Sequence, residues 1–142
     1  QSVRLGVANS IEFLGPLPNT QLPALYSRAS LLVAPSVTTD QGDQEGMPVV
    51  LLEALACKCP VVASDLPAML ELLTHRESGL IVPQKSPADI AEAAIELLQD
   101  PDLRKRLGES GKAAAASKFD WTNISERHAA IFESLMQKSS RR

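Results

Sequence analysis

The chain has 142 residues, of which 44% are hydrophobic and 22% are charged, so it is long enough to enclose the core of one globular domain. Its net charge of -3 comes without a basic or acidic run, which gives no reason to expect a nucleic-acid partner. No apolar segment approaches the length of a membrane span, and no signal peptide opens the sequence.

Apolar segments alternate with helical ones through the first part of the chain. Alternation of apolar and polar residues over Ser10–Leu14 predicts a strand that stops at Gly15-Pro16. The next elements, in chain order, are a helix at Pro23–Arg28, a strand at Leu31–Ala34, a helix at Val49–Ala56, a strand at Pro60–Ser64, a helix at Pro67–Leu73 and a strand at Gly79–Val82. Short apolar strands between helices predict a parallel sheet covered on both faces, which is a doubly wound, Rossmann-like α/β fold.

The last third of the chain is predicted to be helical. Ser86, Pro87 and Asp89 supply the start signals of a helix. Its predicted apolar face consists of Ile90, Ala91, Ala94, Ile95 and Leu98. Asp100-Pro101-Asp102 starts a second helix that runs to about Ala116, and Asp120-Trp121-Thr122 starts a third that runs to about Met136. Because no repeat or linker interrupts this order, we predict a single domain over residues 1–142.

The two cysteines, Cys57 and Cys59, are separated by one residue. That spacing disfavours a mutual disulfide, and two thiols alone make a poor zinc site. We therefore interpret them as small packing residues at a helix end. The lack of a disulfide framework is typical of a cytoplasmic protein.

The helix predicted at Val49–Ala56 carries one charge, Glu53, among apolar residues. It is entered through Gly46 and Pro48, and proline suits a helix start because its missing N–H would be unpaired there. The apolar sequence predicts burial on most sides, where a carboxylate is costly unless it faces a cleft or a partner. Glu53 is therefore either a ligand-binding carboxylate or a buried glutamate paired with a core Arg or Lys.

A second carboxylate, Glu45, lies eight positions before Glu53. This spacing places the two carboxylates roughly 10 Å apart along the helix axis. Between them lies the helix N-terminus, whose positive partial charge makes it an anion site. An acid, an anion site and a second acid in a row predict a site for a sugar, a diphosphate and a ribose.

The stretch Glu-Gly-Met-Pro-Val-Val-Leu-Leu-Glu at 45–53 resembles the Glu-x7-Glu motif of retaining glycosyltransferases with the two-domain GT-B fold, in particular the GT4-type family (glycosyl transferases group 1). Further segments similar to that family, in the same order, are Pro35-Ser36, Pro60-Val61-Val62-Ala63-Ser64-Asp65, Gly79-Leu80-Ile81-Val82-Pro83 and Phe119-Asp120-Trp121. The resemblance covers almost the whole chain. It implies the donor-binding C-terminal half of a GT-B fold, with a helical C-terminal end.

The resemblance also implies roles for the residues of this motif. The implied donor-binding residues are Glu45, Gly46, Met47, Pro48, Val49 and Glu53. Glu45 would contact the donor sugar as the catalytic residue, and Glu53 would bind the ribose hydroxyls. Backbone amides around Met47 and Val49 would meet the phosphates. Pro48 departs from the more usual Gly and has no N–H to donate, so its neighbours must supply these contacts.

The polar loop over residues 36–44 leads into this motif. Ser36, Asp40 and Asp43 are candidates for contacts to donor or acceptor hydroxyls, because loops after parallel strands commonly carry ligand contacts. A solvated turn is the alternative interpretation. We expect no metal ion, because no compact ligand cluster is visible and GT-B enzymes generally do not depend on one. We also expect no cofactor besides the substrate, a UDP- or GDP-sugar.

Part of the family's machinery would precede Gln1. The basic Arg-Lys pair that neutralises the donor diphosphate lies there in the family, as does the N-terminal acceptor domain. We therefore expect a later portion of a larger enzyme, with weak nucleotide affinity and no turnover by this chain alone. Lys58 stands where the family often has Gly at a left-handed helix cap, so either Lys58 tolerates that conformation at some cost or the cap differs. The resemblance further suggests bacterial polysaccharide synthesis, with a sugar or lipid-linked acceptor at the inner face of the cytoplasmic membrane.

Two alternatives remain open from the sequence. A nucleotide-sugar 2-epimerase shares the GT-B architecture, but such enzymes place His near the sugar, whereas His75 and His128 are predicted at the surface. A non-catalytic α/β module that binds a protein partner is the second alternative. Such a module should not need Glu53 in its core helix.

Overall fold

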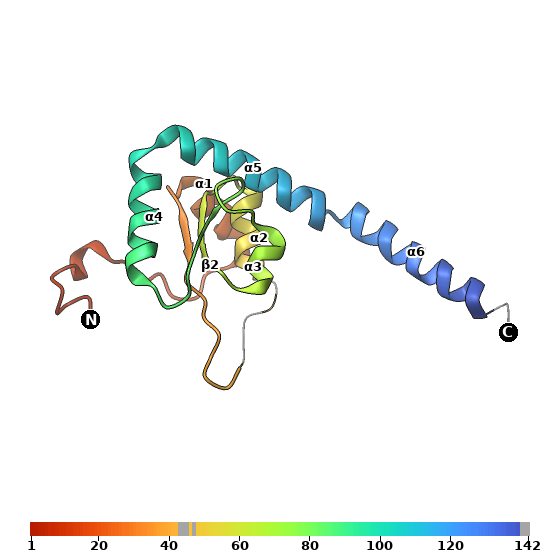
Figure 1. Cartoon of the computed structure of the whole chain (residues 1–142). Helices are drawn as coiled ribbons and strands as arrows, with labels where there is room; N and C mark the ends of the chain where they lie inside the picture. The colour runs from red at the N-terminus through yellow and green to blue at the C-terminus, as the bar shows by residue number, and fades with distance from the viewer. Residues whose placement is uncertain (43–45, 47, 140–142) are drawn as a thin grey trace.

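A computed structural model of the chain describes residues 1–42, 46 and 48–139. Within these residues one parallel sheet lies at the centre, with β2 between its neighbours (Figure 1). Its strands are β1 (Leu32–Ala34), β2 (Val61–Ser64) and β3 (Leu80–Val82), in the order β1-β2-β3. Leu32 pairs with Val61, and Val62 pairs with Leu80. Strand order in the sheet therefore follows order along the chain.

Helices precede, connect and follow these strands. They are α1 (Leu22–Arg28), α2 (Val49–Ala56), α3 (Pro67–Leu72), α4 (Pro87–Gln99), α5 (Pro101–Phe119) and α6 (Trp121–Ser139), with 3-10 turns at Ala8–Ser10 and Asn19–Gln21. These bounds confirm the six helices and the last three strands predicted from the sequence, with shifts of a few residues at their ends.

Both faces of the sheet are covered, because all four residues of β2 are buried and successive side chains point to opposite faces. One face packs against α2 and α3 in a cluster that includes Leu51, Leu55, Val61, Ala63, Met69 and Leu72. The other face packs against α4 in a cluster that includes Val62, Leu80, Val82, Ala93 and Leu97. This arrangement confirms the doubly wound α/β fold.

The long helix α5 joins the two clusters. Its first half contributes Leu103 and Leu107 to the α4 side, and Ala115 in its second half packs on the α2 side. The side chain of Asp100 caps its start, where Oδ1 accepts a hydrogen bond of 2.8 Å from the Leu103 N–H. Figure 1 shows α5 running across the end of the sheet from α4 towards α6.

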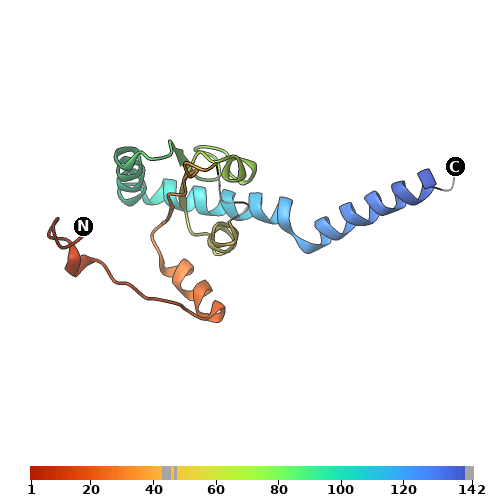
Figure 2. The same cartoon turned by 90° about the horizontal axis from the view of Figure 1, so that it is seen from below.

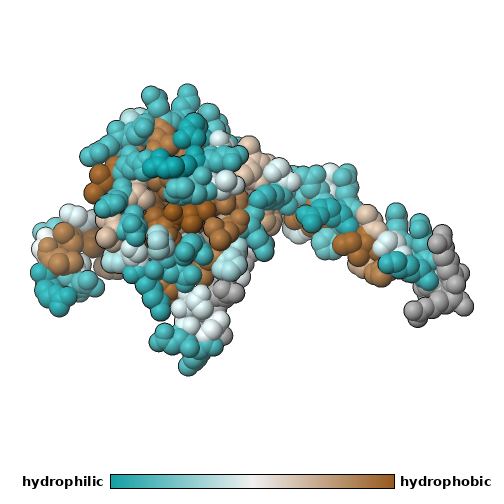
Figure 3. Space-filling model, viewed as in Figure 1, coloured by the Kyte–Doolittle hydropathy of each residue, from teal (hydrophilic) through white to brown (hydrophobic). Residues whose placement is uncertain are grey.

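Beyond α5, α6 continues away from the sheet in both views (Figures 1 and 2). Hydrophobic residues recur along it in the space-filling view (Figure 3). Its exposed large apolar side chains are Trp121, Ile131, Phe132, Leu135 and Met136. In the part of the chain that the structure describes, no helix is both long and apolar enough to cross a membrane.

The strand predicted at Ser10–Leu14 is wrong. Ser10 ends a 3-10 turn, and residues 11–14 pair with no strand that the structure describes. Phe13 is 87% exposed. An alternating pattern becomes a strand only when a neighbour supplies its backbone hydrogen bonds, and this segment lies away from the sheet (Figure 1).

The predicted apolar face of α4 is wrong in part. Ala93 and Leu97 are the buried residues, Ile90 is half-buried, and Ile95 and Leu98 are more than half exposed. The helix carries apolar residues on two adjacent stripes, and both satisfy helical spacing. Contacts with the sheet and with α5 decide between them, and the sequence of α4 alone does not contain that information.

The C-terminal end of α2 matches the expectations for it. Lys58 follows the helix with φ 60°, so of the two alternatives left open by the sequence it adopts the left-handed conformation. Cys57 and Cys59 are free thiols on either side of it, the first partly exposed and the second buried. Their interpretation as packing residues at a helix end is thus confirmed for Cys59, which belongs to the core cluster on the α2 side.

Candidate functional site

The N-terminal end of α2 is open to solvent. Pro48 precedes the helix in an extended conformation and is itself buried. Val49 and Val50, in the first turn, are 63% and 47% exposed, whereas Leu51 and Leu55 are fully buried. The expectation of burial on most sides is therefore wrong for the first turn. Its exposure leaves the positive end of the helix accessible to an anion.

Glu53 faces α1 from the next turn of α2. The Tyr26 hydroxyl donates a hydrogen bond of 3.2 Å to Oε2 of Glu53. Burial, followed by this hydrogen bond and the charge of Glu53, raises the pKa of the Tyr26 phenol. No ion pair among the described residues includes Glu53, so its partner here is a phenol, not the core Arg or Lys that the alternative interpretation requires.

A pocket of about 180 Å³ lies between α1 and α2 beside this pair. Its lining residues are Asn19, Leu22, Pro23, Tyr26, Glu53, Ala56 and Cys57. Tyr26 holds one oxygen of Glu53, and the other oxygen, Oε1, accepts no hydrogen bond from any described residue. A carboxylate with one oxygen fixed and one available is suited to accept a hydrogen bond from a ligand hydroxyl.

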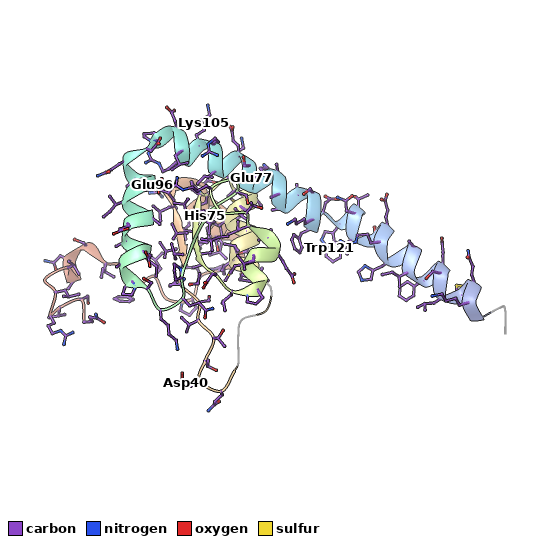
Figure 4. All side chains as sticks on the ribbon, viewed as in Figure 1. Asp40, His75, Glu77, Glu96, Lys105 and Trp121 are labelled. Carbon is purple, nitrogen blue, oxygen red and sulfur yellow. The ribbon has the colours of Figure 1, made fainter. Side chains whose placement is uncertain are left out.

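The loop after β1 carries the remaining candidates that the structure describes. Ser36 is half-buried, two residues after β1. Asp40 lies at the outer tip of the loop (Figure 4). Its fully exposed side chain is 3.7 Å from Lys85 Nζ, which is the weak pairing of a solvated turn. Asp43, Glu45 and Met47 lie outside the described residues, and Gly46 is exposed.

Two residues were missed by the sequence analysis: Tyr26 on α1, beside Glu53, and Gln84 in the loop after β3. Tyr26 lies 27 positions from Glu53, and Gln84 accepts a hydrogen bond from Thr38, 46 positions away. Neither residue belongs to the Glu-x7-Glu motif. The available signal for Tyr26 was that it is the single tyrosine of the chain and lies in the helix predicted at residues 23–28.

Neither histidine lies beside Glu53. His75 is exposed, and its Nδ1 accepts a hydrogen bond of 3.0 Å from the Ile81 N–H. His128 is exposed on α6. Among the residues described, no group of three or more His, Cys, Asp or Glu side chains is placed to hold a metal ion.

Comparison with known proteins identifies the class to which this fold and site belong. The sequence profile of the family "Glycosyl transferases group 1" matches residues 1–114. The chain belongs to this glycosyltransferase family.

The relatives include enzymes that act on inositol-containing acceptors. The chain is 35% identical over 136 residues to D-inositol 3-phosphate glycosyltransferase of Streptomyces bingchenggensis, covering 96% of this chain and 28% of the relative. It is 32% identical over 125 residues to the GDP-mannose-dependent alpha-(1-6)-phosphatidylinositol monomannoside mannosyltransferase of Mycobacterium tuberculosis, covering 87% and 32%. The chain thus spans about a third of the length of these curated relatives.

Solved structures show the same architecture. Sucrose-phosphate synthase from Thermosynechococcus elongatus superposes with a TM-score of 0.83 at 26% identity, covering 96% of this chain and 33% of that protein. Anabaena HepE in complex with UDP superposes with a TM-score of 0.83 at 25% identity, covering 94% and 35%. These matches confirm the C-terminal domain of a GT-B glycosyltransferase.

Proposed function

We propose that this chain is the donor-binding part of a retaining glycosyltransferase, which moves a glycosyl group from a UDP- or GDP-sugar to an acceptor hydroxyl. The observation that carries the proposal is the half-buried Glu53 carboxylate, which is oriented by Tyr26, lines a pocket between α1 and the second half of α2, and follows the exposed first turn of α2 by one turn. Membership of group 1 and the UDP complex of the similar HepE support a nucleotide-sugar donor.

In this proposal the site works by orientation and charge. Glu53 accepts hydrogen bonds from the ribose hydroxyls, and the Val49 amide with its neighbours meets the diphosphate at the helix N-terminus. That positive end stabilises the charge of the departing diphosphate. Glu45 positions the donor sugar, a role that follows from the Glu-x7-Glu resemblance, as does retention at the anomeric carbon. The nucleotide sugar is the substrate, and no further cofactor is part of the proposal.

The proposal extends from the donor to the acceptor. Two similar enzymes transfer to inositol-containing acceptors, by their names, which supports a sugar or lipid-linked acceptor. Such an acceptor would place the complete protein at the inner face of the cytoplasmic membrane, in bacterial polysaccharide or glycolipid synthesis. The part of the protein that binds the acceptor is expected in the N-terminal domain typical of the GT-B fold.

An NMR titration of the chain with UDP, GDP, ADP and their sugar conjugates tests donor binding. We expect chemical-shift changes at Val49 and Glu53 that saturate in the millimolar range. Tighter binding of one nucleotide than of the others would identify the base. Glu53→Gln should abolish the response, whereas Glu71→Gln on the exposed surface of α3 should leave it intact. Equal binding by wild type and Glu53→Gln would contradict the proposed role of Glu53 and favour a non-catalytic module.

A further inference from the structure

A series of hydrogen bonds links the loops that follow the three strands. The Thr38 N–H, after β1, donates to Oε1 of Gln84 at 2.8 Å. The Gln84 N–H, after β3, donates to Oδ1 of Asp65 at 2.9 Å. The Asp65 N–H, after β2, donates to the Val82 carbonyl at 3.0 Å. The carboxyl ends of all three strands are thereby connected through Gln84.

Gln84 ties the backbone of the loop after β1 to the rest of this edge at Thr38. Its side chain is half-buried, so its hydrogen bond to Thr38 is shielded in part from water. The neighbouring Lys85–Asp40 pair spans 3.7 Å between side chains that are 64% and 101% exposed. Exposed pairs of this kind contribute little to stability. The amide oxygen of Gln84 therefore contributes more to the position of Thr38 than the Lys85–Asp40 pair does.

We propose that Gln84 is a positioning residue for the sugar part of the donor. Its amide oxygen holds Thr38, and Thr38 lies between the two candidate contact residues Ser36 and Asp40. Ligands of open parallel sheets bind at the carboxyl ends of the strands, where this loop lies. The inference rests on the proposed function, because the loop matters to the donor only if a nucleotide sugar binds at this edge.

The proposal predicts an uneven effect on the two parts of the donor. In the proposed site the nucleotide is held by α2, through Glu53 and the Val49 amide, and among the described residues no hydrogen bond joins α2 to Gln84. The sugar lies beside the loop after β1. Releasing that loop should therefore weaken the binding of a nucleotide sugar and leave that of the bare nucleoside diphosphate almost unchanged.

Three variants of the chain test this prediction. Gln84→Met keeps the length of the side chain and removes the strong acceptor, whereas Gln84→Glu keeps an acceptor oxygen. Gln99→Met is the matched control, because Gln99 is exposed at the end of α4 and its side chain forms no hydrogen bond among the described residues. Affinities for UDP, UDP-glucose, GDP and GDP-mannose are measured by NMR titration, and Thr38 amide exchange is measured without ligand.

For Gln84→Met we expect faster exchange at Thr38 and a loss of about three- to tenfold in nucleotide-sugar affinity, the effect of one hydrogen bond. The affinity of Gln84→Met for the nucleoside diphosphate should differ from that of wild type by less than about twofold. Gln84→Glu and Gln99→Met should behave as wild type. An equal loss for both ligand classes, or no loss, would overturn the role of Gln84 while leaving the proposed function intact. Failure of the wild-type chain to bind any nucleotide would instead count against the proposed function, and the inference would fall with it.

Discussion

A Cβ atom on Gly108 would lie 2.3 Å from the carbonyl oxygen of Lys58, so α5 passes the end of α2 at a distance that only glycine permits. One turn further along, a Cβ on Gly111 would lie 2.5 Å from Cδ2 of Leu55. Both glycines are buried. The absence of two side chains thus determines how closely α5 approaches α2, the helix that carries Glu53.

Replacing Gly108 should destabilise the chain although it lies inside a helix. In an open helix Gly→Ala is favourable by about 1 kcal/mol. Here the added methyl group meets a backbone carbonyl, and we expect Gly108→Ala to lower the free energy of unfolding by about 1–3 kcal/mol. Urea unfolding measures the change, with Ser110→Ala on the same helix as the control. An unchanged or higher midpoint for Gly108→Ala would show that the two helices are not in close contact.

The phenol of Tyr26 should report on Glu53. Tyr26 is the single tyrosine, so the absorbance of phenolate at high pH follows this residue alone. Burial, the hydrogen bond to Glu53 and the negative charge of Glu53 all raise its pKa above 10.0. We expect Glu53→Gln to lower that pKa, because the charge that opposes phenolate formation is removed, without returning it fully to 10.0 while the burial remains. If the two titration curves coincide, the contact between α1 and α2 does not exist in solution.

Two buried serines should respond in opposite directions to removal of their hydroxyls. Ser64 is 1% exposed, and its Oγ has no hydrogen-bond partner within the described ranges. Ser78 is 4% exposed, and its Oγ accepts from the Thr74 N–H at 2.9 Å. We expect Ser64→Ala to stabilise the chain and Ser78→Ala to destabilise it, each by about 1 kcal/mol. Urea unfolding of the two variants measures the change in the free energy of unfolding for each. If Ser64→Ala is destabilised, the Ser64 hydroxyl has a hydrogen-bond partner in solution.

The two cysteines should differ in reactivity. Burial, and then the neighbouring Cys57, raises the pKa of the Cys59 thiol to about 11. At pH 8 roughly one Cys59 in a thousand is then the reactive thiolate. We expect iodoacetamide to modify the folded chain once, at the partly exposed Cys57, and the Cys57→Ser variant to resist modification. In urea both thiols should react. Rapid modification of folded Cys57→Ser at pH 8 would contradict the burial of Cys59.

The raised pKa of the Cys59 thiol also predicts how the stability of the chain depends on pH. The unfolded chain loses the Cys59 proton near 9.0, and the folded chain loses it near 11. Deprotonation therefore favours the unfolded state between these values, and stability should fall as the pH rises from 9 to 11. Cys59→Ala should reduce that fall, a difference measurable by urea unfolding at the two pH values.

Most of the fold was accessible to prediction because its signals are local. The start of α4 at Pro87 and the burial of β2 follow from adjacent residues. The errors at Ser10–Leu14 and on α4 share a different origin. The strand at Ser10–Leu14 required a partner, and the choice between the two apolar stripes of α4 required its neighbours. Local sequence contains neither kind of information.

The site was predictable only in part for a related reason. Glu53 is visible in the sequence because one charge interrupts an apolar helix, and the motif that includes it has a fixed spacing. Tyr26 and Gln84 act through hydrogen bonds that span 27 and 46 positions. Such contacts arise when the chain brings α1 against α2 and the loop after β1 against the loop after β3, so they become visible with the tertiary structure.

The order of the strands has a consequence for how the chain folds. Each strand pairs with the one before it along the chain, so strands can add one at a time without threading. The connection from Val62 to its partner Leu80 is shorter than that from Leu32 to Val61, so closing it costs less entropy. We therefore expect β2 and β3 to associate first during refolding. Pulse-labelled amide exchange would show protection at Leu80–Val82 before Leu32–Ala34, and the reverse order would exclude this route.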